Sequence, residues 1–140
     1  MHVYLVRSKT IEIYYIPSPQ VHSLKTRLIG GIRPSEGRVE VLINSTWGTV
    51  CDHGWDMLDA NAVCKMLGYY GALNATNAAY FGEGIGPVWL YNIQCGVTDD
   101  NLIDCVQNSY LTRILPSYCS RGHSQDAGVV CSGERIYIND

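Results

Sequence analysis

The sequence predicts a small α+β domain in which disulfides staple several short strands around one helix. Three observations carry this prediction. Short runs of alternating apolar and polar residues recur between turn-forming residues, as is typical of strands. One segment, 56–71, has the apolar spacing of a helix. All six cysteines lie between Cys51 and Cys131 of the 140 residues, an even number that suits three disulfides in one domain.

The first strands are predicted in the segment before the helix. The run RLIGGI from Arg27 is a short strand with a glycine break. In GRVEVLI, the side chains of Val39, Val41 and Ile43 share one face because strand residues alternate with a period of two. The turn sequence Asn-Ser-Thr then leads into WGTVC, so these two runs are expected to form a hairpin.

The helix in 56–71 is the one convincing helical segment. Asp59 is its expected N-cap, and Gly68 is the glycine expected just beyond its end. Cys64 lies beside the apolar stripe, so a disulfide there would fasten the helix to a strand. The stripe consists of Ala62, Val63, Met66 and Leu67.

Later segments are predicted to be loops and short strands. The stretch 71–87 is assigned to loops, and VWLYNIQC from Val88 and DAGVVC from Asp126 are assigned to strands. The predicted organisation is an atypical N-terminal segment or linker at 1–26, a cysteine-rich domain at 27–132 and a C-terminal tail at 133–140.

The N-terminal segment contains one strand-like run, TIEIYYI, and no visible signal peptide. Arg7, Lys9 and Glu12 break its apolar stretches. The chain has no run of about 20 apolar residues, so no membrane-spanning segment is expected in it. Whether a larger parent protein carries a membrane anchor is left open.

The net charge and the number of cysteines indicate which classes of partner and which compartment to expect. The net charge is −3 and no basic run occurs, so nucleic acid is not expected as a partner. Three disulfides favour an oxidising, extracellular compartment. Asn44 and Asn74 begin N-glycosylation sequons, which agree with secretion.

The sequence supports a catalytic or metal-binding role for the cysteines less well than it supports disulfides. Cys51, His53, Cys119 and His123 could together ligate zinc, but zinc needs thiolates and four cysteines would be left unexplained. A Cys–His nucleophile fails for the same reason. No Gly-x-Ser-x-Gly elbow is present, and a strand rather than a helix follows GEGIG, so neither a hydrolase nor a phosphate loop is indicated. An enzyme is not expected.

A longer ordered pattern identifies the family. The segments GRVEVLINSTWGTVCDHGWDMLDANAVCKMLGYYGA, AYFGEGIGPVWLYNIQC, LIDC and YCSRGHSQDAGVVC resemble a scavenger receptor cysteine-rich domain of the six-cysteine, group A type over about residues 27–132. The resemblance implies a curved, mostly antiparallel sheet of about six strands cradling one helix. It also implies the pairs Cys51–Cys119, Cys64–Cys131 and Cys95–Cys105, whereas spacing alone leaves 15 pairings open.

The resemblance also implies a calcium site with an altered ligand set. Many members hold calcium with two acids after the first cysteine and a third four residues after the cysteine that matches Cys95. Those positions are Asp52, His53 and Asp99 here, so one carboxylate is lost. Calcium prefers six to eight oxygen ligands, so we expect binding at about millimolar affinity or weaker and no required cofactor. Asp56 or Asp100 could compensate for the lost carboxylate.

Two further hypotheses concern these residues and their neighbours. The acids flanking His53 favour its charged form, which predicts ligand binding that depends on pH and little on calcium. Tyr91 and Gln125 replace acids common in the family, so a second cation site is not expected.

The resemblance implies a non-catalytic extracellular recognition domain within a larger receptor or secreted protein. Its implied ligands are proteins, polyanions or microbial surfaces, with roles in endocytosis and innate immunity. The arginines available for a polyanion are few and scattered, so a protein partner is at least as well supported; they are Arg33, Arg38, Arg113 and Arg121. The alternatives are an accessory module of a mosaic enzyme, such as a serine protease or a lysyl oxidase-like enzyme, and a structural spacer.

Overall fold

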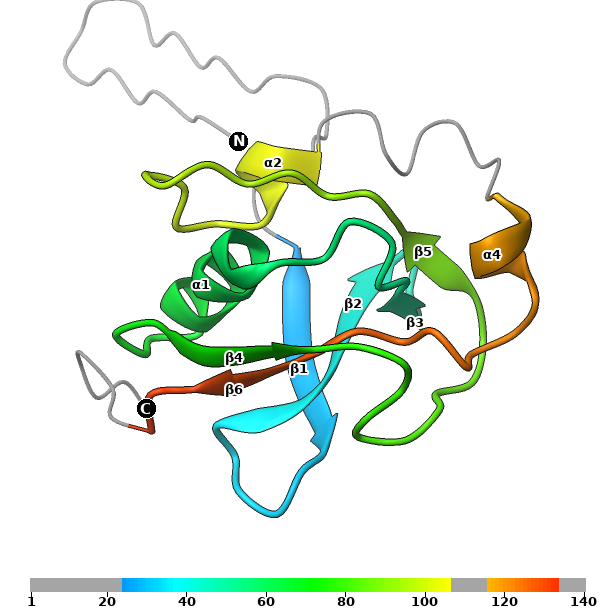
Figure 1. The fold of residues 1–140 in the computed structure, drawn as a ribbon, viewed down its shortest axis with the longest axis horizontal. Helices are drawn as coiled ribbons and strands as arrows, with labels where there is room; N and C mark the ends of the chain where they lie inside the picture. Colours follow the sequence, from blue (N-terminus) through cyan, green and yellow to red (C-terminus); the bar gives the residue numbers. More distant parts are fainter. Residues whose placement is uncertain (1–23, 107–115, 134–140) are drawn as a thin grey trace, which may run out of the picture.

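The computed structural model describes residues 24–106 and 116–133 (Figure 1). The strands are β1 (Lys25–Gly30), β2 (Glu36–Ile43), β3 (Thr46–Val50), β4 (Ala72–Thr76), β5 (Val88–Leu90) and β6 (Gly128–Cys131). The helices are α1 (Met57–Met66), α2 (Ile103–Val106) and α4 (Ser117–Ser120).

The six strands form one curved sheet in the order β4-β6-β2-β3-β5, and β1 pairs with β2 outside this path. Every pairing is antiparallel except that of β3 with β5. Helix α1 packs against β4 and β6 (Figure 1). The predicted fold of about six strands and one principal helix is therefore confirmed, and α2 and α4 are additional helices of one turn each.

The central strand β2 sets the core as its alternation predicts. Val39 and Val41 have no exposed surface, and Ile43 is also buried. The β2–β3 connection is a hairpin with a loop of two residues, Asn44 and Ser45, whose φ angles are 52° and 62°. Positive φ at both positions matches the turn type whose twist fits a hairpin, so this part of the prediction is confirmed.

Helix α1 begins earlier than predicted. Its N-cap is Asp56, whose side chain accepts hydrogen bonds from the Leu58 and Asp59 backbone N–H groups. The Asp59 side chain in turn accepts from the Asp56 N–H at 2.9 Å. Two aspartates three residues apart thus form a capping box, and the assignment of Asp59 as N-cap was wrong by one turn. Gly68, with φ of 97°, follows the helix as predicted.

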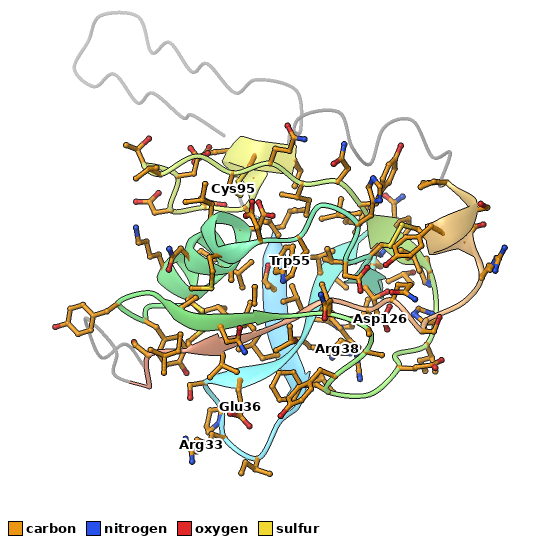
Figure 2. The ribbon with its side chains drawn as sticks, in the orientation of Figure 1. Arg33, Glu36, Arg38, Trp55, Cys95 and Asp126 are labelled. Atoms are coloured by element: carbon orange, nitrogen blue, oxygen red, sulfur yellow. A yellow bond between two sulfur atoms is a disulfide. The ribbon has the colours of Figure 1, made fainter. Side chains whose placement is uncertain are left out.

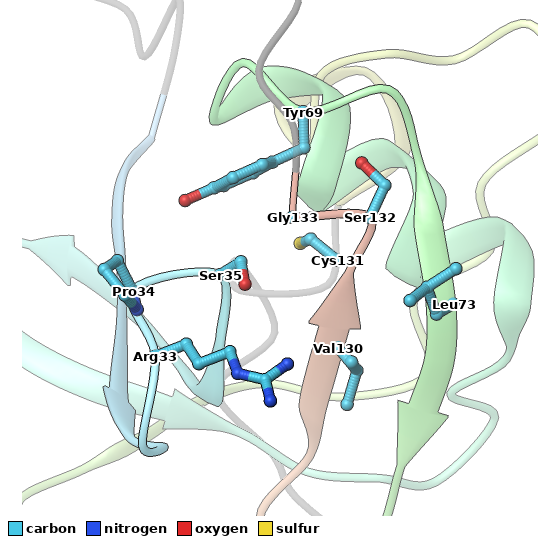
Figure 3. A pocket seen from close by; sticks show the side chains of 9 residues that line it. All are labelled: Arg33, Pro34, Ser35, Tyr69, Leu73, Val130, Cys131, Ser132 and Gly133. Atoms are coloured by element: carbon cyan, nitrogen blue, oxygen red, sulfur yellow. The ribbon is translucent and has the colours of Figure 1, made fainter.

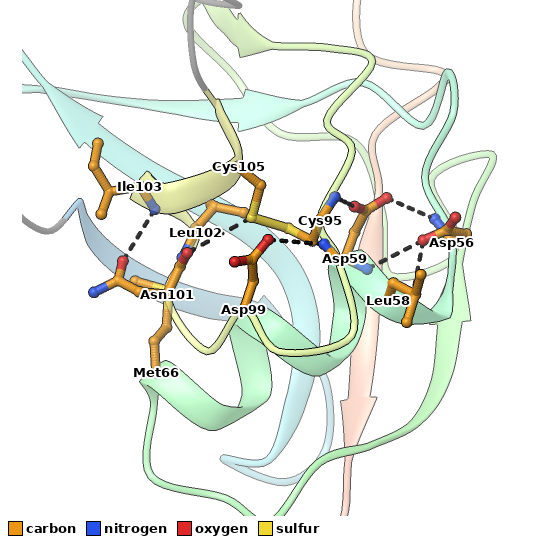
Figure 4. Close-up of a disulfide and its surroundings, with 11 residues drawn as sticks. Asp56, Leu58, Asp59, Met66, Cys95, Asp99, Asn101, Leu102, Ile103 and Cys105 are labelled. Carbon is orange, nitrogen blue, oxygen red and sulfur yellow. Dashed lines mark hydrogen bonds between the residues drawn. A yellow bond between two sulfur atoms is a disulfide. The ribbon is translucent and has the colours of Figure 1, made fainter.

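Asp59 also connects α1 to the Cys95–Cys105 disulfide loop (Figure 4). The side chain is fully buried, and its Oδ1 accepts from the Cys95 N–H at 2.9 Å. Burial raises the pKa of Asp59 to about 7, while the bonds from Cys95 and Asp56 partly oppose this shift. A buried carboxyl therefore fixes the first turn of the helix to the start of that loop.

Three boundaries differ from the sequence prediction. β1 begins at Lys25, so two residues assigned to the N-terminal segment, Lys25 and Thr26, belong to the sheet, and Leu24 before them is buried in the core. Strand β4 lies within the stretch assigned to loops, because pairing with β6 outweighs the low strand propensity of asparagine and alanine. Strand β5 is shorter than predicted and ends at Leu90. The run TIEIYYI and the tail beyond Gly133 lie outside the described residues.

Two of the three disulfides tie the C-terminal part of the domain to residues 51–64, and the third closes a local loop. They join Cys51 to Cys119, Cys64 to Cys131 and Cys95 to Cys105, the pairs that the resemblance implies. The first two span 68 and 67 residues, and the third spans 10. The longer bridges attach α4 to the residue after β3 and attach β6 to α1.

The long bridges should stabilise the domain more than the short one. We expect replacing Cys64 and Cys131 by alanine to lower the free energy of unfolding by about 4 kcal/mol. Replacing Cys95 and Cys105 should lower it by about 3 kcal/mol, because the entropy of loop closure grows with loop length. Urea unfolding of both double variants measures this. A larger loss from the short bridge would contradict the expectation.

Candidate functional site

The loop after β3 carries Asp52, the first residue of the predicted calcium ligand set. This side chain is 8% exposed, and its carboxylate already has protein donors. Oδ2 accepts from the Ala78 N–H at 2.7 Å, and Oδ1 lies 3.0 Å from the Tyr118 hydroxyl. That hydroxyl also lies 2.9 Å from Gln125 Oε1, so its single proton goes to either acceptor. Asp52, Tyr118 and Gln125 thus form a polar cluster beside the Cys51–Cys119 disulfide.

The Tyr118 hydroxyl is held in its neutral form by this contact. A hydrogen bond to the Asp52 carboxylate raises the pKa of Tyr118 above its usual value, with smaller effects from desolvation and from the charge of Asp52. The ring remains 48% exposed. Tyr118 was not among the predicted site residues, although it precedes Cys119, which the resemblance pairs with the cysteine next to Asp52. That adjacency was the available signal.

His53 and Asp99 are not brought to Asp52 as a set of ligands. His53 is exposed, and its ring meets the Tyr118 ring edge to face with centroids 5.9 Å apart. Asp99 lies inside the Cys95–Cys105 loop, where its Oδ2 accepts from the Gly96 N–H at 2.8 Å (Figure 4). The pH-sensitive role of His53 stays a prediction.

Calcium needs several ligand atoms close together, so the side chains within 24–106 and 116–133 can be compared with this requirement. Only one group of three ligating side chains there has its donor atoms within 4.8 Å of one another, and it is Cys95, Asp99 and Cys105. Both sulfurs belong to a disulfide and are not thiolates. The ligand atoms of Asp52, His53 and Asp99 do not form such a group, and calcium binding there stays a prediction. Asp56 Oδ1 caps α1, and a compensating role for this residue stays a prediction.

The arginines differ sharply in what they contact. Glu40 is buried and accepts from two of them, with Arg27 Nη2 at 2.7 Å from Oε1 and Arg38 Nε at 2.9 Å from Oε2. Arg27 also lies over the Trp47 ring, 4.0 Å from its centroid. Arg38, a predicted ligand residue, is thus a structural ion-pair partner whose side chain is 12% exposed.

The other three arginines predicted to bind ligand differ in whether the structure describes them. Arg33 and Arg121 are exposed, and neither makes a side-chain ion pair within the described part of the chain. Arg113 lies outside the described residues. The sequons are accessible, since Asn44 in the β2–β3 turn and Asn74 on β4 are both exposed.

A second polar cluster surrounds the buried Asp126 (Figure 2). His123 Nδ1 lies 3.0 Å from Asp126 Oδ2 and 3.2 Å from Thr49 Oγ1. A catalytic triad places its nucleophile and its acid on opposite ring nitrogens, whereas both contacts here involve Nδ1. Thr49 is also fully buried, so this trio lacks the geometry of a hydrolase site.

The Asp126 cluster instead anchors the glycine-rich loop 82–86. Three side chains bind the loop backbone at alternate residues. These contacts hold the GEGIG motif, which lies in the stretch predicted to be a loop. The contacts join Arg38 Nη1 to Gly82 O at 3.0 Å, the Gly84 N–H to Asp126 Oδ2 at 2.8 Å, and His123 Nε2 to Gly86 O at 2.8 Å.

Comparison with known proteins agrees with this architecture. The family model described as the scavenger receptor cysteine-rich domain (SRCR) matches residues 29–132. The chain belongs to the scavenger receptor cysteine-rich family. Domains of this family serve extracellular recognition, and the SRCR domain here has the fold of its solved relatives. None of the helices within the described residues is long and apolar enough to cross a membrane.

Two solved SRCR domains are similar to this one. The third SRCR domain of murine neurotrypsin is 39% identical, with a TM-score of 0.67 over 84% of this chain and 100% of that chain. The SRCR domain of mouse MARCO, crystallised as a dimeric form, is 40% identical, with a TM-score of 0.59 over 76% of this chain and 93% of that chain.

Two full-length relatives are similar in sequence. Galectin-3-binding protein from Mesocricetus auratus is 47% identical over 108 residues, which is 77% of this chain and 18% of that protein. The protein of the same name from Rattus norvegicus is 44% identical over 116 residues, 81% of this chain and 19% of that protein. The chain thus spans under a fifth of the length of these relatives.

The contact between Tyr118 and Asp52 has a measurable consequence. Because a carboxylate acceptor stabilises the neutral phenol, Tyr118 should lose its proton at a higher pH than an exposed tyrosine without such a partner. Replacing Asp52 by asparagine should move the pKa of Tyr118 down toward its usual value of about 10. Tyrosine ¹³Cζ shifts followed by NMR from pH 8 to 12 report this, with Tyr118→Phe for assignment. An unchanged midpoint in Asp52→Asn would refute the contact.

Proposed function

We propose that this SRCR domain, of the six-cysteine, group A type, is a recognition module of a larger extracellular receptor or secreted protein and that its ligand is a protein. The observation that carries the choice of a protein ligand is the pairing of Arg27 and Arg38 with Glu40. Polyanion binding depends on several unneutralised cations acting together. Within 24–106 and 116–133, the exposed arginines that make no side-chain ion pair are Arg33 and Arg121.

The extracellular setting is supported by the covalent structure. Every cysteine is in a disulfide, and such bridges persist in oxidising compartments. The exposed sequon residues Asn44 and Asn74 suit a glycoprotein. The relatives named galectin-3-binding protein supply the first partner to test, galectin-3.

We also propose that recognition requires no calcium. Support comes from the Asp52 carboxylate, whose two oxygens are engaged by Ala78 and Tyr118. The loss of a carboxylate at His53 acts in the same direction, because fewer oxygen ligands weaken calcium binding. A microbial surface would be bound by such a module through the proteins that the surface carries.

A second candidate function is that of an accessory module in a mosaic enzyme. It is favoured by the similarity to a neurotrypsin domain that is the third of its kind in that protein. Catalysis would then lie elsewhere in the parent protein. The sequence of the full-length transcript separates this role from that of a receptor module.

Binding of galectin-3 and of heparin by the glycosylated, oxidised chain tests the protein-ligand proposal. We expect saturable galectin-3 binding in biolayer interferometry, unchanged by calcium or by a chelator, and no retention on heparin at about 150 mM salt, where weak surface electrostatics are screened. The double variant Asn44→Gln/Asn74→Gln shows whether galectin-3 contacts the glycans or the protein surface. Heparin retention without galectin-3 binding would overturn the choice of a protein ligand.

A further inference from the structure

A groove of about 690 Å³ opens where the β1–β2 loop approaches the ends of β4 and β6 (Figure 3). One wall carries Arg33 and Pro34, and the other carries Leu73 of β4. Val130 of β6 and the ring of Tyr69 also face it. The groove thus combines one cation with a mainly apolar lining.

Arg33 supplies the positive charge of the groove. The residue is exposed, and no acidic side chain within the described ranges lies at ion-pair distance from it. Glu36 is the nearest acid along the chain, but its Oε2 lies 3.2 Å from the Ile32 N–H and accepts from it. The guanidinium extends across the groove toward Val130 (Figure 3).

The backbone that carries Arg33 is fixed to the sheet. The Ser35 carbonyl accepts from the Cys131 N–H at 2.8 Å, and the Arg33 carbonyl accepts from the Glu36 N–H at 3.3 Å. Cys131 is in turn bonded to Cys64 of α1. The loop and the floor of the groove therefore hold their relative positions before any ligand binds, which lowers the entropic cost of binding.

The apolar part of the groove includes an exposed aliphatic side chain. Leu73 is 67% exposed on β4, an edge strand of the sheet. Val130 is partly exposed on the adjacent β6, and Tyr69, although buried, lines the same groove. A ligand that covers Leu73 and Val130 removes apolar surface from water and gains affinity from it.

Another groove, of about 470 Å³ beside Trp47, differs in its charge. Its two arginines, Arg27 and Arg38, are both paired with Glu40. An anionic ligand there would have to compete with a buried carboxylate. The groove at Arg33 is therefore the better match for an acidic group.

We propose that the Arg33 groove binds a peptide segment of a protein partner in which a carboxylate side chain stands beside aliphatic side chains. A single guanidinium matches one carboxylate through two parallel hydrogen bonds, whereas a polyanion needs several cations. Leu73 and Val130 receive the aliphatic neighbours of that carboxylate. This inference rests on the proposed function, since it assigns a surface and a ligand chemistry to protein recognition.

Two synthetic peptides test the proposal on the oxidised full chain. Ac-Leu-Asp-Leu-NH2 and Ac-Leu-Asn-Leu-NH2 have nearly the same shape and differ in one negative charge. In an NMR titration, the acidic peptide should shift the Leu73 and Val130 methyl signals and the Arg33 Nε–H signal. The neutral peptide should bind about fivefold more weakly, which is the upper end for an exposed charge pair.

Matched variants separate the groove from the rest of the surface. Arg33→Gln should remove the preference for the acidic peptide, and Leu73→Ser should weaken both peptides. Arg121→Gln removes another exposed arginine, one that does not line the groove, and should change neither affinity. Unperturbed amide spectra confirm that each variant is folded.

Three outcomes would overturn the assignment: no shift with either peptide, equal affinity for both peptides, or equal loss of preference in Arg121→Gln. Failure of this proposal is distinguishable from failure of the proposed function. Galectin-3 binding by the Arg33→Gln variant, together with the absence of peptide shifts, would place recognition on another surface. Heparin retention without galectin-3 binding by the wild-type chain would instead contradict the proposed function.

Discussion

The domain depends on the position of its last strand. β6 lies between β4 and β2, so the sheet is incomplete until residues near 130 return to strands formed near residues 36 and 72. Such long-range pairing is opposed by the entropy of closing a long loop. The Cys64–Cys131 bridge, which spans 67 residues, restricts the unfolded chain across this closure. The Cys51–Cys119 bridge does the same for α4.

The same closure builds the surfaces described above. It brings Tyr118 and Gln125 to Asp52, and Asp126 with His123 to the loop 82–86. It also forms the Arg33 groove, because the Cys131 N–H on β6 donates a hydrogen bond to the Ser35 carbonyl of the β1–β2 loop. Each of these surfaces therefore depends on the fold being complete, and loss of the long disulfides would remove them together.

The sequence predicts the features that depend on neighbouring residues. The alternation of Val39 and Val41, the tight turn at Asn44 and the end of α1 at Gly68 all follow from local chemistry. Strand β4 escaped prediction because its partner lies about 55 residues away, and asparagine and alanine carry little strand propensity. The contact of Tyr118 with Asp52 was missed for a related reason, because the two residues are 66 positions apart. The pairing of Arg38 with Glu40 is local, and the strand alternation that places both on one face of β2 was the available signal.

We propose that contacts from Ala78 and Tyr118 occupy the Asp52 oxygens that calcium would need. A calorimetric calcium titration at pH 7.4 tests it most directly, with the wild-type chain beside the double variant His53→Asp/Tyr118→Phe. The account predicts no saturable binding by the wild-type chain up to about 1 mM calcium and measurable binding by the variant, which regains a carboxylate and frees Asp52 Oδ1. Saturation of the wild-type chain below about 1 mM would contradict it.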